Sequence, residues 1–258
     1  MTHELVSIVT PSYNTADFIA ETIKSVQDQT YTNWEMIIVD DCSTDRTDEI
    51  VAEFVAEDPR IRYMKNEKNC GAAQTRNRAL REARGRWIAF LDSDDLWLPT
   101  KLERQVSFME ANGYSFSYTQ YSEITESGQD SGVCVSGPGK ITRAGMFAFC
   151  WPGCLTVMYD AAVVGLIQIA DIKKNNDYAM WLKICRGADC YLLSERLAKY
   201  RRARTGSIST QSLLTMIQWH YKLFREAEKM SLMCSVWRTG VNLACGLYKK
   251  KRYVKRVH

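Results

Sequence analysis

The sequence has no Cys-x-x-Cys motif, although it contains nine cysteines among 258 residues. Their number is also odd, so reduced thiols in a cytoplasmic protein are the simplest interpretation. A long apolar run is also missing. The most apolar window, residues 154–170, is interrupted by Asp160 and Gln168, which makes it too short and too polar for a membrane span. No basic patch followed by an apolar stretch begins the chain, so we expect no secretory signal.

A strong excess of one charge is missing as well, because 34 Lys and Arg residues stand against 30 Asp and Glu residues. The charges are unevenly placed: six of the last ten residues are basic, whereas the first hundred residues are rich in carboxylates. A uniformly basic nucleic-acid binder does not have this distribution, and we expect no nucleic-acid partner. The chain length suits one large domain, or one domain with a helical appendage.

Strand and helix patterns alternate through the first half. Apolar, strand-like runs lie at residues 6–10, 35–39, 61–64 and 87–91, with helical periodicity at 18–26, 50–55 and 71–83 between them. This alternation predicts an α/β fold, with a Rossmann-like, mostly parallel central sheet flanked by helices on both faces. The later pattern predicts these elements: a helix from 99 to 112, a strand at 114–119, an exposed loop at 123–140, a helix at 176–186 and short strands near 190–200.

Polar clusters follow three of the predicted strands. Asn14 comes after the first strand, Asp40 and Asp41 after the second, and residues 92–95 after the fourth. Ligands of such sheets bind beyond the carboxyl ends of the strands. We therefore expect the three clusters to converge on one site.

The cluster at residues 92–95 has the sequence Asp-Ser-Asp-Asp. Carboxylates two residues apart, such as Asp92 and Asp94, can ligate a hard divalent cation and leave positions for phosphate oxygens. The alternative is an acidic helix N-terminus, where Asp is also favoured. Crowding three carboxylates at the end of a buried strand is costly without a cation, and this favours the metal site.

Two further segments suit a nucleotide. A carboxylate at a strand end, such as Asp41, can accept a hydrogen bond from the imide N–H of uracil, although Ser43 or Asp45 could instead serve as helix caps. Gly71 lets the backbone pass close to a nucleotide, and Arg76 can balance the charge of a diphosphate or contact the base. The alternative for this second segment is a helix of small residues packed on the sheet, with Arg76 in solvent.

The residues alone leave two interpretations for each of two segments in the second half. Asp177 precedes an apolar helical face and suits either a helix cap or a base that deprotonates a sugar hydroxyl. Phe147, Phe149 and Trp151, with Gly153, suit either an apolar platform for a sugar ring or ordinary core packing.

Together these segments resemble the inverting, nucleotide-sugar-dependent glycosyltransferases of family two, which have the GT-A fold. The resemblance is carried by residues 6–14, 39–45, 71–80 and 90–95, in the family's order and spacing. It is strong over residues 5–112 and looser to about residue 210. It implies a catalytic domain at 1–210, with a nucleotide-sugar half at 1–112 and an acceptor half at 113–210, followed by a basic helical extension at 211–258.

The resemblance also implies roles for individual residues. Asp94 with Asp92 would ligate Mn²⁺ or Mg²⁺, and Asp177 would be the general base, although Asn176 and Ala179 replace acidic residues of the family's pattern. The UDP-sugar donor would be bound by Pro11, Tyr13, Asn14, Asp41, Gly71, Arg76, Asp92, Ser93 and Arg201. A hexose or N-acetylhexosamine would pass with inversion to a glycan or a polyprenyl-diphosphate-linked sugar, as in bacterial lipopolysaccharide, O-antigen or capsule synthesis.

The segment from residue 213 to 253 interleaves aromatic and aliphatic residues with basic ones. Such a helix can lie on an anionic membrane, which would place the protein on the inner face of the cytoplasmic membrane. The alternative is a helix packed on the catalytic domain with a solvated tail. Two other functions compete: a metal-dependent nucleotidyltransferase, which is expected to carry a Gly- and Arg-rich loop where this chain has Pro11 to Asn14, and a catalytically silent nucleotide- or carbohydrate-binding module.

Overall fold

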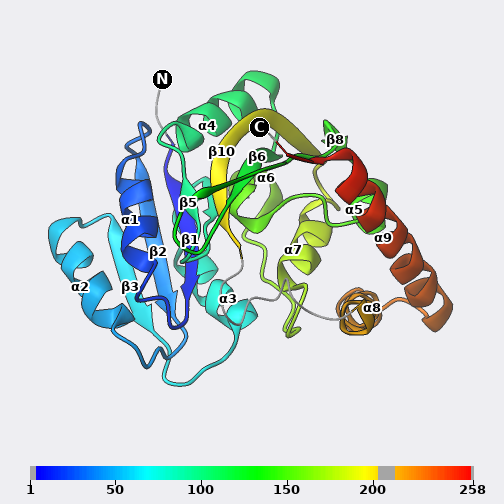
Figure 1. The fold of residues 1–258 in the computed structure, drawn as a ribbon, viewed down its shortest axis with the longest axis horizontal. Helices are drawn as coiled ribbons and strands as arrows, with labels where there is room; N and C mark the ends of the chain where they lie inside the picture. Colours follow the sequence, from blue (N-terminus) through cyan, green and yellow to red (C-terminus); the bar gives the residue numbers. More distant parts are fainter. Residues whose placement is uncertain (1–3, 203–212, 257–258) are drawn as a thin grey trace.

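The first four strands form a parallel half-sheet. The structure is a computed structural model, and it describes residues 4–202 and 213–256 (Figure 1). Strand β1 (Val6–Ser12) pairs in parallel with β2 (Trp34–Asp40) and β4 (Trp87–Phe90), and β2 pairs in parallel with β3 (Ile61–Lys65). Helices complete the connections between these strands, as parallel pairing requires: α1 (Ile19–Gln27), α2 (Thr47–Glu57) and α3 (Ala72–Glu82).

The second half of the sheet is mixed. Strand β9 (Met158–Asp160) pairs antiparallel with β4 and with β6 (Phe116–Ile124), and β6 pairs antiparallel with β7 (Asp130–Val135) but parallel with β10 (Cys190–Arg201). The main strand order is β11-β7-β6-β9-β4-β1-β2-β3. The predicted α/β class is confirmed. The mostly parallel pairing is found only in the first half, because short connections such as the β6–β7 hairpin reverse the chain without a crossover.

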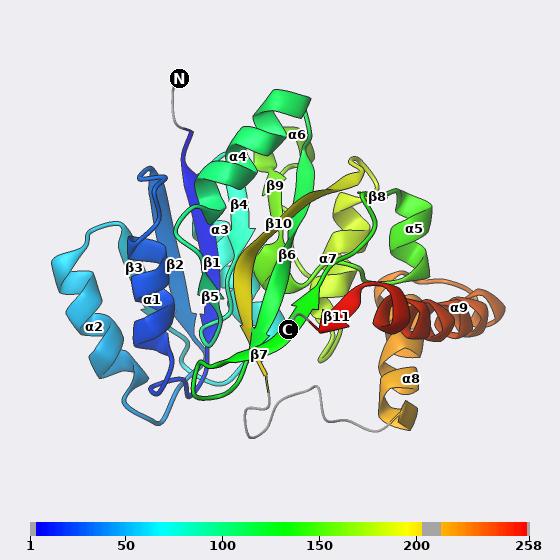
Figure 2. The same cartoon turned by 45° about the horizontal axis from the view of Figure 1, so that its top comes forward.

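Helices cover both faces of the sheet, which explains why its central strands are apolar throughout. Ile37 and Val39 of β2 belong to a core shared with α3 and α7 (Asn176–Ile184). Met36 and Ile38, which alternate with them, belong to a second core shared with α1, α2 and α4 (Lys101–Asn112). Figure 2 shows the sheet with its helical layers from a second direction. The polar ends of the strands are left at the sheet edge.

Two predictions for the second half were wrong in detail. Residues 123–140 are not a single exposed loop, because β7 lies within them and pairs with β6 and with β11. The short strands expected near 190–200 are one strand, β10, whose pairing with β6 shifts register between Leu193 and Ala198. The Ser- and Gly-rich composition around β7 hid a strand that depends on its tertiary partners.

The C-terminal elements join the sheet. Helix α8 (Leu213–Lys222) leads through a π-helical segment (Leu223–Ala227) to α9 (Leu232–Arg252), and β11 (Val254–Arg256) then pairs antiparallel with β7. Among the described residues no helix combines the length and apolar character needed to cross a membrane. The remaining short elements are β5 (Leu96–Trp97), β8 (Lys140–Ile141), α5 (Arg143–Ala148), a 3-10 turn (Cys154–Thr156) and α6 (Ala161–Val164).

The aromatic residues near α5 serve the core. Phe147 and Trp151 are buried, and Trp151 donates its indole N–H to the Gly145 carbonyl at 3.0 Å. Phe149 packs so closely on Gly246 of α9 that a Cβ there would lie 3.1 Å from the ring. Of the two interpretations of these aromatic side chains, core packing is the one observed.

Candidate active site

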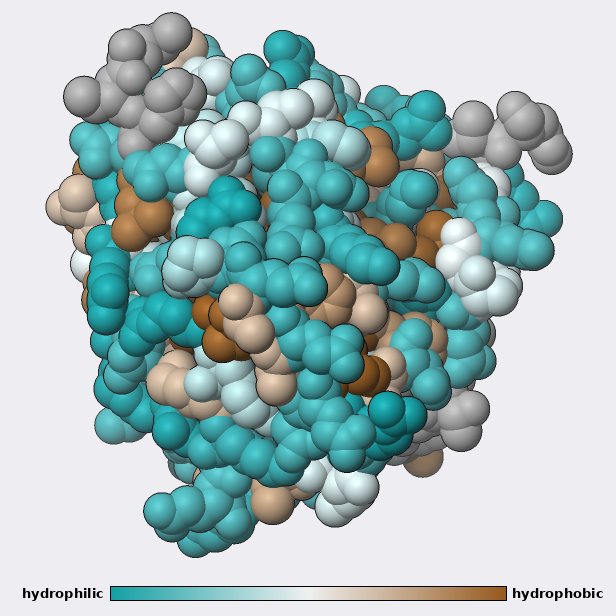
Figure 3. All heavy atoms as spheres, turned by 90° about the vertical axis from the view of Figure 1, so that its left-hand side faces the viewer, coloured by the Kyte–Doolittle hydropathy of each residue, from teal (hydrophilic) through white to brown (hydrophobic). Residues whose placement is uncertain are grey.

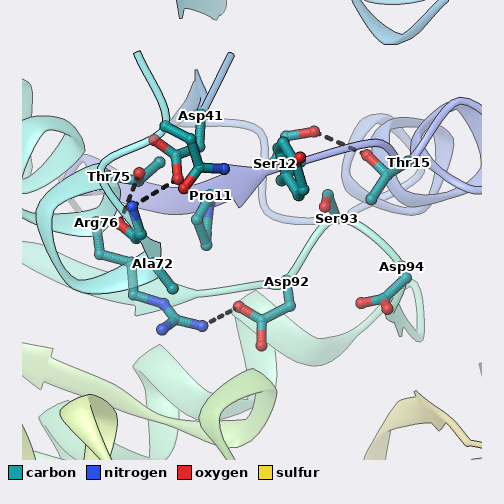
Figure 4. Close-up of a pocket in the computed structure, with 13 residues that line it drawn as sticks. Pro11, Ser12, Thr15, Asp41, Ala72, Thr75, Arg76, Asp92, Ser93 and Asp94 are labelled. Atoms are coloured by element: carbon teal, nitrogen blue, oxygen red, sulfur yellow. Dashed lines mark hydrogen bonds and ion pairs between the residues drawn. The ribbon is translucent and has the colours of Figure 1, made fainter. Parts of the chain in front are cut away.

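Residues that follow β1, β2 and β4, among them Tyr13, Asp41 and Asp92, line one cavity of about 440 Å³. It lies beyond the carboxyl ends of β1, β2 and β4, where the alternating pattern placed a ligand site. Figure 4 shows the side chains that surround it. We call it the donor cavity, and its lining residues are Pro11, Ser12, Tyr13, Thr15, Asp41, Asn69, Gly71, Ala72, Thr75, Arg76, Asp92, Ser93 and Asp94.

Asp41 organises the loop before α3. Its Oδ1 accepts hydrogen bonds from the Asn66 side chain (2.9 Å) and the Cys70 N–H (2.8 Å), and its Oδ2 accepts from the Gly71 N–H (2.7 Å). Gly71 has φ of +81°, a left-handed conformation that favours glycine. A carboxylate has about four acceptor positions, so Asp41 retains capacity for one further donor in the cavity that it lines.

The alternative interpretation of this segment was turn and helix-start bonding, and the carboxylates on either side of Asp41 make those bonds. Asp40 is fully buried and accepts from the N–H and hydroxyl of Ser43 at 2.8 and 2.6 Å. Asp45 accepts from the N–H of Thr47, the first residue of α2, at 3.1 Å. Local turn and helix-start bonding therefore falls to Asp40 and Asp45, and Asp41 faces the cavity.

Asn14 and Arg201 are not among the residues that line the donor cavity. The Asn14 side chain accepts from the Thr44 N–H at 2.9 Å, and its backbone adopts φ of +50°. Arg201 is buried, and its guanidinium donates to the carbonyls of Asp94 (2.8 Å) and Glu126 (2.6 Å) and to Glu21 (2.7 Å). Both residues brace loops that carry lining residues.

The three carboxylates of the acidic turn after β4 have different surroundings. Asp92 and Asp94 line the cavity with Ser93 between them (Figure 4). Asp95 is buried, and its Oδ1 accepts from the backbone N–H of Arg201 at 2.8 Å, which fastens the turn to β10 and not to a helix start. Burial, with the charges of Asp94 and Asp92 nearby, holds the Asp95 pKa well above its usual value.

The donor set of this turn fits a divalent cation that is shared with a substrate. Within residues 4–202 and 213–256 no group of three or more His, Cys, Asp or Glu side chains could hold a metal by itself. Asp92 and Asp94 offer hard carboxylate oxygens, the type that Mg²⁺ and Mn²⁺ prefer. Mg²⁺ is commonly bound by one or two carboxylates together with substrate phosphates, and this turn has that composition.

A second cavity of about 560 Å³ adjoins the first, and both are lined by Gly71, Ala72, Arg76 and Asp92. We call it the acceptor cavity. Asp177, in the first turn of α7, lies in its wall. Its other lining residues are Asp95, Tyr121, Gly153, Cys154, Leu155, Lys173, Lys174, Asn175, Asn176 and Tyr200.

Arg76 forms the boundary between the cavities. It is buried, and its guanidinium donates to Asp92 Oδ1 at 2.5 Å and to Asn176 Oδ1 at 2.9 Å. Burial alone would lower the Arg76 pKa, but the carboxylates of Asp92 and Asp177 outweigh it and raise that pKa. The interpretation of Arg76 as a solvated side chain is therefore wrong, and a fixed positive charge stands where the cavities meet.

The surroundings of Asp177 shift the pKa of its carboxyl. Burial raises the pKa of its carboxyl above the usual value, while the charge of Arg76 and a 2.8 Å hydrogen bond from the Tyr178 N–H oppose that rise. The residue at the helix N-cap position is Asn175, with φ of +56°, so Asp177 is the second residue of the helix, and it lines the acceptor cavity. A raised carboxyl pKa brings a general base nearer to working pH.

Comparison with known proteins agrees with this geometry. Residues 7–133 match the family described as Glycosyl transferase family 2. Over 234 residues the chain is 41% identical to the putative teichuronic acid biosynthesis glycosyltransferase TuaG of Bacillus subtilis, and the alignment covers 90% of this chain and 92% of that protein. The chain belongs to glycosyl transferase family 2. It is therefore a glycosyltransferase, as the resemblance of its strand-end motifs implied.

Other members and neighbours extend the comparison. The chain is 41% identical over 217 residues to the Escherichia coli UDP-Glc:alpha-D-GlcNAc-diphosphoundecaprenol beta-1,3-glucosyltransferase WfgD, covering 83% of this chain and 84% of that one. Staphylococcus aureus TarS 1–349, solved with UDP, has a TM-score of 0.70 at 19% identity and covers 96% of this chain and 73% of its own. The mannosyltransferase PcManGT of Pyrobaculum calidifontis, solved with GDP-Man and Mn²⁺, has a TM-score of 0.66 at 16% identity, with 94% and 75% covered. The GT-A fold is confirmed.

Within this family-2 fold, several lining residues escaped the sequence reasoning. Lys173 and Lys174 line the acceptor cavity, and their position before α7 in a Lys-Lys-Asn-Asn run was a usable signal. Cys154 and Tyr121 gave no signal, because they come from a 3-10 turn and from β6 and meet the cavity only through folding. Asn176, where the family's pattern has an acid, supplies an amide oxygen to Arg76 and so leaves Arg76 one anionic partner, Asp92, at hydrogen-bond distance.

Proposed function

We propose that this glycosyltransferase moves a hexose or N-acetylhexosamine from a UDP-sugar to a sugar linked to polyprenyl diphosphate, with inversion to a β-linkage. One observation carries the proposal: a cation, Arg76, and a carboxylate, Asp92, line both cavities, and Asp177 lines the second one. A leaving diphosphate in the donor cavity and a base in the acceptor cavity would then act on opposite sides of one reacting carbon.

The donor cavity suits uridine diphosphate. Asp41 has acceptor capacity for the imide N–H of uracil, a donor that cytosine lacks. Tyr13 is 47% exposed at the cavity wall and offers a ring face for the base. Pro11 and the backbone at Gly71 would complete the pocket, and Ser93 and Asp92, which also line the cavity, would lie beside the ribose. Asn14 and Arg201 would act on this donor site through the loops that they brace.

Charge on the departing diphosphate is the main electrostatic demand of the reaction. Mn²⁺ or Mg²⁺ held by Asp94 and Asp92 would supply a Lewis acid there. Arg76 adds a positive charge that is already fixed by two hydrogen bonds, so little reorganisation is needed as the charge on the leaving group grows.

Asp177 would remove the proton from an acceptor hydroxyl as its oxygen attacks the anomeric carbon. The new C–O bond forms on the face opposite the departing UDP, the bond to the diphosphate oxygen breaks, and the proton ends on the Asp177 carboxylate. One in-line displacement converts an α-linked donor into a β-glycoside. The raised pKa of Asp177 makes its carboxylate a stronger base than an exposed one.

An anionic acceptor fits the second cavity. Lys173 and Lys174 line it, and Lys174 lies 5.5 Å from the ring centre of Trp219 in α8. Two lysines beside a sugar site suit the diphosphate of a lipid-linked acceptor, which is the acceptor class that the name of WfgD gives for that relative. Such an acceptor lies in a membrane, so the proposal includes peripheral contact with an anionic membrane, and a role in bacterial lipopolysaccharide or O-antigen synthesis.

The test is transfer by the purified chain from a panel of UDP-sugars to a polyprenyl-diphosphate GlcNAc acceptor with Mn²⁺. We expect one UDP-sugar to be used, a β-linked product by NMR, and turnover lower by about 10²–10⁴-fold with the matched Asp177→Asn protein. Turnover of nucleoside triphosphates without sugar transfer would instead indicate a nucleotidyltransferase. UDP binding without any turnover would indicate a silent binding module, and either result overturns the proposal.

A further inference from the structure

Helix α9 is amphipathic in the opposite sense to an ordinary surface helix. Its buried residues are polar: Ser235, Thr239 and Asn242 are 0%, 5% and 1% exposed. A surface helix usually buries its apolar stripe and exposes its polar one. Six large apolar residues of α9 instead face solvent, and we call them the α9 outer face: Leu232, Met233, Val236, Trp237, Leu247 and Tyr248, which are 53–83% exposed.

Hydrogen bonds to the catalytic domain explain the polar inner side. The Asn242 side chain donates to the Tyr178 hydroxyl at 3.0 Å, and the Lys249 ammonium donates to the Trp151 carbonyl at 2.7 Å. Thr239 donates to the Ser235 carbonyl within the helix at 2.8 Å. These contacts fix how α9 is turned about its axis. The helix does pack on the catalytic domain, but with its polar side, and the apolar side remains outward.

The outer face is unlike the surface on the other side of the molecule. The face over α1, α2 and β3 is mostly hydrophilic, with apolar residues only in small separate spots (Figure 3). Trp237 and Met233 of α9 are by contrast 70% and 83% exposed on one helix. Exposed apolar patches of this kind mark a surface that is covered in function.

Charge identifies what covers it. Residues 232–256 contain seven Lys and Arg residues and no Asp or Glu. Five of the seven are exposed at the end of α9 and in β11: Lys250, Lys251, Arg252, Lys255 and Arg256. An apolar stripe next to uncompensated positive charge fits anionic lipid headgroups above an acyl layer. A second copy of the chain would offer no acidic residue from the same segment to neutralise that charge.

We propose that the α9 outer face docks on an anionic membrane surface, with its apolar side chains in the interface and the terminal basic residues on lipid phosphates. This docking rests on the proposed function, and it identifies the surface by which the enzyme would contact the membrane. Asn242 of α9 donates a hydrogen bond to Tyr178, the neighbour of Asp177 in α7. The helix that lies on the bilayer would therefore be fixed to the helix that carries the proposed base. A lipid-linked acceptor would then reach the acceptor cavity from the surface that α9 rests on.

Flotation of the full chain with vesicles tests the docking without any activity. We expect recovery with phosphatidylcholine–phosphatidylglycerol vesicles, little with pure phosphatidylcholine, and loss as salt rises. The variant Met233→Ser/Trp237→Ser/Leu247→Ser should lower the partition constant by more than ~10-fold, since apolar burial sets binding strength. The matched control is Val163→Ser, at an equally exposed apolar residue on α6, and it should float as the parent does.

The results that would contradict the docking surface differ from those that would contradict the proposed function. Equal flotation of the triple variant and the parent, or no flotation of the parent, overturns the docking surface. A dimer in lipid-free sedimentation that the triple variant abolishes would assign the face to a second copy instead. Circular dichroism of each variant establishes that it is folded. Failure of sugar transfer with intact flotation would overturn the proposed function and leave the docking surface standing.

Discussion

Arg76 donates a 2.5 Å hydrogen bond to Asp92, and both side chains line the donor and the acceptor cavity. The pair crosses from α3 to the turn after β4, so two parallel βα units contribute one residue each to the boundary. Arg76 is buried and Asp92 is half-buried, so removing Asp92 would leave the buried Arg76 charge without its anionic partner, and the pair resists displacement. The reacting groups of donor and acceptor are therefore expected on either side of a fixed ion pair.

Replacing the proposed base should separate chemistry from binding. We expect Asp177→Asn to lower kcat by about 10²–10⁴-fold, the contribution typical of a positioned general base, with the Kd for UDP unchanged. Isothermal titration with UDP and a transfer assay on the same protein measure both. Near-normal transfer by Asp177→Asn would exclude this base. Asp171→Asn, six residues earlier and exposed, is the matched control.

The pH dependence should follow the raised pKa of Asp177. A base acts only when deprotonated, so kcat/KM should fall as pH drops through that pKa, at a pH above the usual value of 3.8 for an Asp carboxyl. The charge of Arg76 lowers this pKa, so Arg76→Gln should move the acid limb to higher pH, whereas Arg76→Lys should not. Both Arg76 variants will also lose rate, but the pH at which the acid limb lies does not depend on that loss. An acid limb at the same pH in all three proteins contradicts the coupling.

We expect sugar transfer to require a divalent metal ion that is bound by the acidic turn at residues 92–95. Chelation with EDTA should abolish transfer and added Mn²⁺ or Mg²⁺ should restore it. Asp94→Asn should raise the Mn²⁺ concentration for half-maximal activity by ~10-fold or more, because one of two protein carboxylate ligands is lost. Asp28→Asn, an exposed Asp at the end of α1, should leave that concentration unchanged. Full activity in EDTA rules out the metal site.

The lysine pair should select for the charge of the acceptor. We expect Lys173→Gln/Lys174→Gln to raise the acceptor KM by about tenfold for a diphosphate-linked sugar, since charge-assisted bonds to phosphate are lost. The KM for an uncharged alkyl glycoside and for the UDP-sugar should not change. Lys24→Gln, an exposed lysine of α1, serves as the control. An equal effect on both acceptors would assign the pair a structural role.

The sequence predicted the parts of the site that lie directly after buried strands. The runs ending at Asp40 and Phe90 are apolar because helices cover both sheet faces, and this made the strands and the polar residues after them visible. A pattern of apolar and polar residues does not predict the direction in which a side chain points. Arg201 is the last residue of β10, and its guanidinium donates to Glu21 and to two carbonyls.

Elements that depend on distant partners were also hidden. Strand β7 is half exposed and exists through pairing with β6 and β11, so its own residues carried little signal. The periodicity of α9 predicted an amphipathic helix correctly. Which stripe is buried depends on polar partners such as Tyr178, 64 residues away in the chain, and no local pattern contains that information.

Lys101 offers a test of stability that is separate from the reaction. It is fully buried in the first turn of α4, and among the described residues its ammonium has no hydrogen-bond partner and lies 3.7 Å from the Trp97 ring centre. Burial lowers its pKa well below the usual 10.5. The unfolded chain therefore binds more protons than the native one at pH values between the lowered native pKa and 10.5, and stability should rise with pH across that range.

Lys101→Met should stabilise the protein by about 1–3 kcal/mol at pH 7. The substitution removes the cost of burying an ammonium or of holding it deprotonated, while a methionine sulfur keeps contact with Trp97. Thermal unfolding monitored by circular dichroism at several pH values measures the change. The gain should shrink at higher pH, because the parent no longer loses a proton on folding there. A destabilised variant, or a gain that does not depend on pH, would show that the Trp97 ring compensates the buried charge in full.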